Sequence, residues 1–268
     1  MTDAQKNTPE PERITSLAEY AQLVSDKASA EDRVWFRGTS AADAYPLTPS
    51  LYRRPSDGTP TFYADLEGSL VDTFRHRSPP FMTGPLPAAT PEGDLETLFI
   101  MQHYGLPTRL LDWTENPFVA LYFALVKWRR SLPLSDAGVW TLNPKRLNQV
   151  SLMGMSKDSD IILSPNHSNL RAYRPGHIER EKPVAMYGVH NSKRIVAQRG
   201  VFVLFGSAPD PMDAQEAVGP DGVLDKIIID KDSAAAIFSA LFRMGFTDSV
   251  VFPDLDGLAR EVSYQHGY

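Results

Sequence analysis

The sequence contains no cysteine among its 268 residues. Disulfide bonds and thiolate metal sites are therefore excluded, and cysteine usage does not fix the redox compartment. No apolar run approaches the roughly 20 residues that span a bilayer. Residues 1–10 also lack the apolar centre of a signal peptide. We therefore expect a cytoplasmic protein with no membrane partner.

Several catalytic and binding motifs are missing as well. There is no Walker A sequence, no Gly-x-Gly-x-x-Gly after a strand and no His-Glu-x-x-His. The six histidines show no metal-ligand spacing, so we expect no metal and no tightly bound cofactor. No Gly-x-Ser-x-Gly elbow is present, but a Ser-His-Asp triad is assembled in space and is therefore not excluded by the sequence. The net charge of −6 disfavours nonspecific nucleic-acid binding, which depends on neutralising phosphates.

The composition is that of a globular protein, with 42% apolar and 22% charged residues. Loops rich in proline and glycine interrupt the predicted elements without separating two cores. We therefore predict a single α+β domain over residues 13–268, behind a disordered tail at 1–12. The prediction is of small, partly antiparallel, split sheets flanked by helices. Its core motifs lie at 30–205, and a strand–helix–strand unit follows at 223–268.

The middle of the chain, residues 102–124, carries the most informative pattern. Gly105 can take the left-handed conformation that ends a helix. Residues 108–112 form a short extended stretch. Asn116, followed by proline, is a helix start, because its side chain caps free N–H groups and proline at the first position loses no hydrogen bond. The run 118–126 is apolar on every side and predicts a helix central to the core.

Polar side chains are dense at the rims of these buried elements, and such groups must find partners or serve a ligand. For any one of them an internal hydrogen-bond network is the commoner role, whereas for the group we favour a ligand site. The set comprises Gln102, His103, Thr108, Arg109, Asp112, Trp113 and Thr114.

Two further motifs lie outside this segment. Residues 33–37 alternate as a strand, which places Arg37 at a strand end beside Gly38, where backbone can approach a ligand. From these five residues alone, a surface arginine on a strand edge is the favoured interpretation. Residues 194–205 are predicted as a strand, and Gly200 inside it indicates a bulge or a close backbone approach.

Three of these pieces together resemble the FRG domain family, named for its Phe-Arg-Gly signature. The matching pieces are Phe36-Arg37-Gly38, the run from Gln102 to Thr114, and Gln198-Arg199-Gly200. The stretch from Phe252 to Gly257 is similar to the C-terminal pattern of the family. The resemblance implies a bacterial or phage-borne domain.

The chain also resembles the ADP-ribosyltransferase fold, with its constellation of Arg, Ser/Thr and Glu. The order here is Arg37, then Asp112-Trp113-Thr114, then Gln198. In that fold a guanidinium binds pyrophosphate, a hydroxyl holds the nicotinamide ribose, and a carboxylate stabilises an oxocarbenium-like centre. This sequence departs from the pattern, because Gln198-Arg199-Gly200 stands where Gln-x-Glu is expected. Asp112 could supply the missing charge; otherwise the domain binds a nucleotide without breaking it.

The resemblances therefore imply a pocket that binds NAD or a related nucleotide as substrate, with ADP-ribosyl transfer to an unspecified macromolecular acceptor, or NAD cleavage, as the activity. The implied catalytic residues are Arg37, Asp112, Thr114 and Gln198. The implied nucleotide-binding residues are Phe36, Gly38, Gln102, His103, Thr108, Arg109, Trp113, Asn116 and Tyr122. One alternative is a non-catalytic module that binds a protein or a nucleic-acid end. The least favoured is a nuclease that uses Asp254 and Asp256 with a metal.

Overall fold

The computed structural model describes residues 11–28, 33–57, 59, 61–82, 84–129, 131, 133–153, 161–189, 192–215 and 223–268. Nine strands, nine α-helices and five short 3-10 helices make up the regular structure in these ranges. The strands are β1 (Glu12–Ile14), β2 (Trp35–Thr39), β3 (Leu110–Thr114), β4 (Ala137–Leu142), β5 (Tyr173–Arg174), β6 (His177–Ile178), β7 (Val184–Tyr187), β8 (Gly200–Leu204) and β9 (Leu224–Ile229). The helices are α1 (Leu17–Lys27), α2 (Phe62–Arg77), α3 (Pro91–His103), α4 (Pro117–Leu125), α5 (Pro144–Ser151), α6 (Lys193–Ala197), α7 (Ala234–Arg243), α8 (Asp248–Val251) and α9 (Leu255–Gln265).

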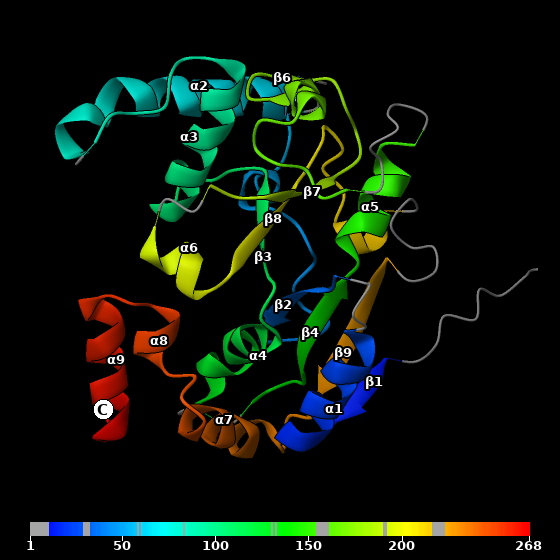
Figure 1. Ribbon diagram of the computed structural model, residues 1–268, viewed down its shortest axis with the longest axis vertical. Coiled ribbons are helices and arrows are strands. Elements are labelled where there is room, and N and C mark those ends of the chain that lie inside the picture. Colours follow the sequence, from blue (N-terminus) through cyan, green and yellow to red (C-terminus); the bar gives the residue numbers. More distant parts are fainter. Residues whose placement is uncertain are drawn as a thin grey trace, which may run out of the picture.

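Seven of the strands form one sheet in the order β1-β9-β4-β2-β3-β8-β7, and β5 and β6 form a separate hairpin. β1 and β9 are parallel, whereas every other neighbouring pair is antiparallel. The predicted α+β class is confirmed, with a sheet that is larger and more uniformly antiparallel than expected (Figure 1).

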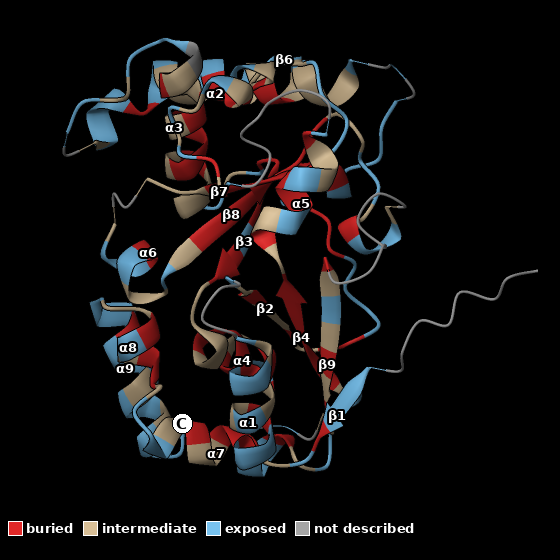
Figure 2. Ribbon diagram, turned by 45° about the vertical axis from the view of Figure 1, so that its right-hand side comes forward, coloured by how far each residue is buried: buried red, intermediate tan, exposed pale blue. Residues whose placement is uncertain are grey.

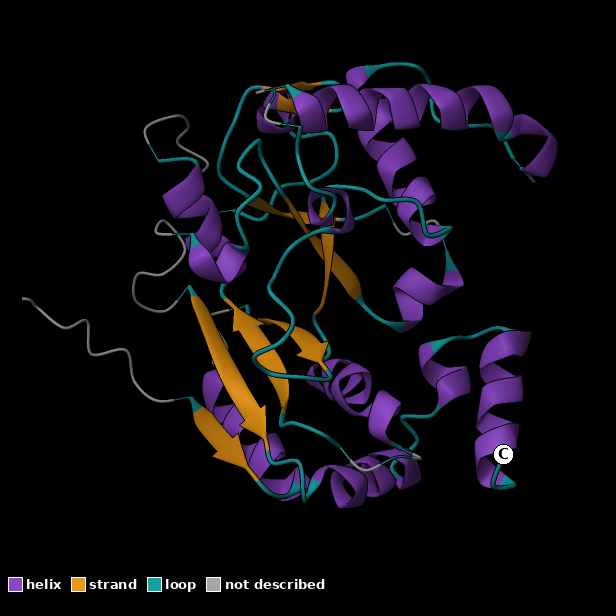
Figure 3. Cartoon of the chain, turned by 180° about the vertical axis from the view of Figure 1, so that it is seen from behind, coloured by secondary structure: helices purple, strands orange, loops and turns teal. Residues whose placement is uncertain are grey.

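The sheet nearly divides in two at its centre. β2 and β3 are joined through one residue pair, Phe36 with Thr114, whereas β2 pairs with β4, and β3 with β8, along five residues each. The strands therefore fall into two half-sheets, β1-β9-β4-β2 and β3-β8-β7, which are seen as two groups in Figure 3. The two strands diverge beyond the shared pair and leave an opening between the half-sheets.

Separate helix layers cover the two half-sheets on the same side. α1, α4 and α7 pack on the first half-sheet around Phe36, and α3 packs on the second around Leu110. Directly paired residues of an antiparallel sheet share a face, and side chains alternate along a strand. Phe36, Thr114 and Leu110 therefore lie on one face. The opposite face is covered by one continuous core that includes Trp35 and Trp113, and Figure 2 shows how fully the central strands are buried.

Helix α4 lies against β2 because Gly38 has no side chain. A Cβ placed at Gly38 would come within 1.9 Å of the carbonyl oxygen of Ala120 and 2.6 Å of the amide nitrogen of Ala124. The helix begins as predicted, because the Asn116 side chain accepts hydrogen bonds from the amides of Phe118 and Val119. The glycine of the Phe-Arg-Gly motif is thus needed for close packing of a helix on a strand.

The strand predicted over 194–205 is wrong in its first part. Ser192 caps a short helix by accepting a hydrogen bond from the amide of Ile195, and this helix, α6, runs to Ala197. Arg199 then takes a positive φ of 46°, which turns the chain into β8. The turn therefore depends on Arg199, whereas Gly200 begins the regular pairing with β3.

The C-terminal strand–helix–strand prediction is also wrong in its last part. β9 and α7 occur as expected, but the second strand of the predicted unit does not occur in residues 223–268, where the one-turn helix α8 and then helix α9 follow α7. Asp248 at the start of α8 is buried and paired with Arg129, so the segment is fixed to the core through its side chain instead of through a strand ladder. Residues 1–10 of the predicted tail lie outside the described residues, and Glu12 belongs to β1. Within the described chain, no helix combines the length and apolar character needed to span a bilayer.

Candidate functional site

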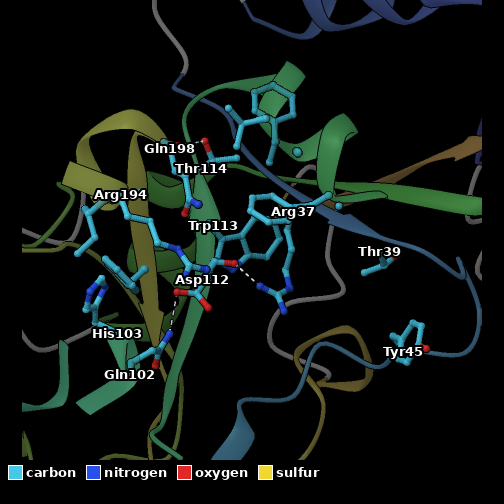
Figure 4. Close-up of a pocket in the computed structure, with 18 of the residues that line it drawn as sticks. Arg37, Thr39, Tyr45, Gln102, His103, Asp112, Trp113, Thr114, Arg194 and Gln198 are labelled. Atoms are coloured by element: carbon cyan, nitrogen blue, oxygen red, sulfur yellow. Dashed lines mark hydrogen bonds between the residues drawn. The ribbon is translucent and has the colours of Figure 1, made fainter. Parts of the chain in front are cut away.

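A cavity of about 640 Å³ opens where β2 and β3 diverge. It lies between the helix layers of the two half-sheets, and Figure 4 shows its labelled side chains converging from both. The lining residues are Phe36, Arg37, Gly38, Thr39, Ser40, Tyr45, Pro46, Arg53, Phe99, Gln102, His103, Asp112, Trp113, Thr114, Val119, Ala120, Phe123, Arg194, Ile195, Gln198, Gly200 and Phe202.

Arg37 spans the opening between the half-sheets. Its Nη1 donates a 2.5 Å hydrogen bond to the main-chain carbonyl of Asp112, replacing a contact that two paired strands would have made (Figure 4). Among the described residues, Arg37 has no ion-pair partner within 4 Å, so its other N–H groups are available to a ligand. Burial lowers the pKa of Arg37, the Asp112 carboxylate opposes this shift, and Arg53 adds to it by repulsion. An arginine stays charged at neutral pH despite such a shift.

Asp112 is the one carboxylate among the described lining residues. Its Oδ1 accepts a 2.7 Å hydrogen bond from the Gln102 side-chain amide, and the Gln102 carbonyl accepts one from the Thr108 hydroxyl. This chain of contacts fixes the orientation of a carboxylate that is exposed to the cavity. The arrangement can present a negative charge at a fixed position to a developing cation.

Thr114 and Gln198 line the cavity, but internal contacts already use much of their hydrogen-bonding capacity. The Thr114 hydroxyl donates to the main-chain carbonyl of Gln198 at 2.6 Å and accepts from the amide of Asn116 at 2.9 Å. The Gln198 side-chain amide donates to the carbonyl of Val251 at 3.0 Å. The hydroxyl proton of Thr114 is therefore used within the protein, and the ribose contact implied for Thr114 stays a prediction.

The charges around the cavity are unbalanced. Arg37, Arg53 and Arg194 face one carboxylate, that of Asp112. Arg53 donates from Nε and Nη2 to the carbonyl of Thr48, an uncharged partner. Burial, followed by the nearby charge of Arg194, lowers the pKa of His103 and favours a neutral imidazole at neutral pH. The site is therefore suited to an anion.

Most of the residues predicted from the sequence meet at this cavity. Those that line it are Phe36, Arg37, Gly38, Gln102, His103, Asp112, Trp113, Thr114 and Gln198. The ring of Trp113 also belongs to the core on the opposite face and is only 3% exposed, so little of its surface is left for contact with a ligand. Four predicted residues, Thr108, Arg109, Asn116 and Tyr122, do not line the cavity.

Among these four residues, Arg109 differs most from its predicted role in nucleotide binding. Its side chain and that of Glu67 are both 0% exposed, and Nε of Arg109 lies 2.7 Å from a Glu67 carboxylate oxygen. The remaining guanidinium groups donate to the main-chain carbonyls of Phe205 at 2.5 Å and Tyr173 at 2.6 Å. Strand alternation points Arg109 away from the face of Asp112, so its side chain joins β3 to neighbouring segments and does not line the cavity.

The other three are also engaged internally. Thr108 is fully buried and holds Gln102, so it acts one contact away from the cavity. Asn116 is used as the cap of α4. The Tyr122 hydroxyl donates to buried Asp248 at 2.8 Å, and burial followed by this hydrogen bond raises the pKa of Tyr122. These side chains stabilise the walls of the site.

Two of the three cavity arginines, Arg53 and Arg194, are not among the residues predicted from the sequence. Arg53 ends a short 3-10 helix, Ser50–Arg53, which lies outside the motifs on which the site prediction rests. Arg194 was assigned to a strand, and the signal that could have corrected this was Ser192, a helix-capping residue. Both arginines reach the cavity through tertiary packing, which local patterns do not encode.

The acidic pair considered for a nuclease has a structural use. Asp254 caps α9 by accepting a 2.7 Å hydrogen bond from the amide of Gly257, and Asp256 is an exposed residue of the first turn. No group of three or more His, Cys, Asp or Glu side chains in the described ranges could hold a metal ion. The pair therefore builds a helix start, as acidic residues at such positions commonly do.

Comparison with protein families finds a match to the FRG domain over residues 32–131. This range contains β2, α3, β3 and α4, and with them Arg37 and Asp112, whereas Arg194 and Gln198 lie beyond it. No curated protein and no solved structure matches the chain.

Proposed function

Since the chain carries an FRG domain, we propose that the cavity built largely by this domain binds NAD or a related nucleotide. The observation that carries the proposal is the position of Arg37. It lies in the opening of a split sheet, hydrogen-bonded through one guanidinium nitrogen and facing a cavity with its remaining donors. An arginine in this state is well suited to a phosphate, which its planar fork can bind through two hydrogen bonds.

The size and chemistry of the cavity support the same ligand class. Its volume of about 640 Å³ lies within the range of small-molecule sites. Three arginines against one carboxylate favour an anion, and the apolar walls suit the rings of a nucleotide. Tyr45, 47% exposed at the rim, and Phe123, partly buried, are aromatic surfaces that a base could cover.

In this proposal the cavity also supports ADP-ribosyl transfer or NAD cleavage. The bond between the nicotinamide nitrogen and the ribose carbon breaks, nicotinamide leaves with the electron pair, and an acceptor oxygen bonds to that carbon as it loses its proton. Asp112, oriented by Gln102, supplies the negative charge that stabilises the oxocarbenium-like centre. Neutral His103 is the cavity residue suited to accept the proton of the acceptor.

A specific observation favours binding without cleavage as the second candidate. Gln198-Arg199-Gly200 provides no carboxylate, and the donors of Thr114 and Gln198 are used internally. Release of nicotinamide from NAD separates the two candidates. Steady release that is lost in Asp112→Asn supports catalysis, whereas tight binding without release supports a nucleotide-binding module.

Calorimetric titration with NAD tests the proposal. Wild-type protein should release heat on binding and melt at a higher temperature with NAD present. Arg37→Ala should weaken binding about tenfold or more, because a hydrogen bond to a charged group contributes about 1.5–3 kcal/mol. Arg171→Ala is the control, since Arg171 has a 73% exposed side chain and does not line the cavity. Absence of heat together with an unchanged melting temperature would overturn the proposal.

A further inference from the structure

We propose that Arg194 is a second phosphate-binding residue of this cavity and that the ligand therefore carries a diphosphate. The inference rests on the proposed function and deepens it, because it assigns a substrate class to the same site. Arg194 comes from α6, outside the matched FRG segment, and it lines the cavity opposite Arg37 (Figure 4).

Arg194 is held in place without using its hydrogen bonds. Its guanidinium lies 4.7 Å from the centre of the Phe252 ring, close enough for a cation–π contact. Within the described residues, no hydrogen bond from its side chain and no ion pair within 4 Å occurs. A cation–π contact uses none of the N–H donors of a guanidinium, which leaves them for the hydrogen bonds of phosphate recognition.

The aromatic support of Arg194 is itself fixed. The Phe252 amide donates to the carbonyl of Asp248 at 2.8 Å, and its ring packs edge-on against Phe123 at a centroid distance of 5.8 Å. The neighbouring Val251 carbonyl accepts the hydrogen bond from Gln198. The end of α8 therefore positions Arg194 through the Phe252 ring. The same segment is joined to the cavity lining by the hydrogen bond between Val251 and Gln198.

The two arginines approach from different halves of the sheet. Arg37 belongs to β2 of the first half-sheet, whereas Arg194 is on α6, which leads into β8 of the second. Asp112 lies between them in Figure 4, and neither arginine is within 4 Å of its carboxylate. The described lining of the cavity holds three arginines and one carboxylate, so positive charge is in excess there, and a ligand with two linked phosphates balances this excess. One phosphate would leave one of the two arginines unpaired.

Calorimetry with inorganic pyrophosphate, inorganic phosphate and NAD tests the inference on the full-length protein. Wild-type protein should bind pyrophosphate and NAD more tightly than phosphate. Arg194→Ala should weaken pyrophosphate and NAD binding about tenfold or more, as loss of a charge-assisted hydrogen bond predicts, and should leave phosphate binding nearly unchanged. The affinity of Arg194→Lys for pyrophosphate and NAD should fall between those of wild type and Arg194→Ala, because lysine keeps the charge but lacks the planar guanidinium.

Arg260→Ala is the matched control. Arg260 also lies 4.7 Å from the Phe252 ring but does not line the cavity, so Arg260→Ala removes a charge beside the same ring and no cavity cation. Arg260 also lies 3.6 Å from a carboxylate oxygen of Asp248, which keeps its 2.7 Å ion pair with Arg129 in this variant. Equal losses in Arg194→Ala and Arg260→Ala, or no loss in Arg194→Ala with NAD still bound, would overturn the inference and spare the proposed function. Pyrophosphate binding that depends on Arg194 without any NAD binding would overturn the NAD proposal and spare the inference. Binding of none of the three probes would overturn both.

Discussion

At the scale of single residues, Gly38 lies where the backbone of α4 contacts β2. A Cβ at this position would overlap the Ala120 carbonyl oxygen at 1.9 Å, and main-chain atoms cannot move aside as a flexible side chain can. Gly38→Ala should therefore lower the free energy of unfolding by about 3 kcal/mol or more, as measured by chemical denaturation. Gly84→Ala, where a Cβ would meet no atom within 4 Å among the described residues, should have little effect. Equal stability of the two variants would contradict the packing argument.

The buried pair of Arg109 and Glu67 makes a second prediction at this scale. Glu67→Gln removes the charge that faces a fully buried guanidinium, and such a break costs about 3–5 kcal/mol. Denaturation should show this loss, while NAD affinity of the folded fraction stays unchanged because neither residue lines the cavity. Glu92→Gln, at an exposed ion pair with Arg171, should leave stability nearly unchanged. A loss of NAD affinity in Glu67→Gln without a loss of stability would place this pair in the site after all.

His103 gives a pH dependence with a definite sign. Burial and Arg194 lower its pKa in the folded protein below the ordinary value of 6.5, so the folded state binds fewer protons than the unfolded state. The resulting contribution to stability is present above pH 6.5 and is lost as the pH falls through the lowered pKa. The stability difference between wild type and His103→Gln should therefore change in favour of the variant on acidification, when unfolding is measured from pH 7.5 to pH 5. A difference that is independent of pH would contradict this environment for His103.

At the scale of elements, α4 was predictable and α6 and α8 were not. Asn116-Pro117 is a local start signal and the apolar run that follows is continuous, so both the beginning and the burial of α4 could be read from neighbouring residues. Residues 194–197 and 249–251 have apolar content that suits either a strand or a helix. Their state is decided by the Ser192 cap, by the positive φ of Arg199 and by the ion pair of Asp248. The last two depend on distant parts of the chain.

The cap of α4 makes a prediction at this scale. Asn116→Ala removes the acceptor for two amides at the helix start and should cost about 1 kcal/mol of stability. NAD affinity should be unchanged, because Asn116 supports the wall without lining the cavity. Thermal denaturation and calorimetry on the same preparation check both statements. A large loss of NAD affinity with an unchanged melting temperature would contradict this prediction and indicate that Asn116 contacts NAD directly.

At the scale of the whole molecule, the sheet is two half-sheets that meet at one residue pair, Phe36 with Thr114. The motif residues Arg37, Asp112 and Gln198 could be assigned to one site from the sequence, since their order and residue types suit one ligand. Arg53 and Arg194 could not be assigned to the site from the sequence, because they reach it through the packing of a 3-10 helix and of α6. Strand alternation at β3 also places the side chains of Asp112 and Arg109 on opposite faces of the sheet. The sequence does not show which face borders the cavity, because that depends on how the helices pack on the sheet.

The most direct test of the central claim is a crystal structure of the protein with NAD. The account predicts a phosphate of NAD within hydrogen-bond distance of the Arg37 guanidinium, in the opening between β2 and β3, with the nicotinamide ribose toward Asp112. NAD bound away from this opening, or bound in the cavity with no phosphate contact to Arg37, would contradict it.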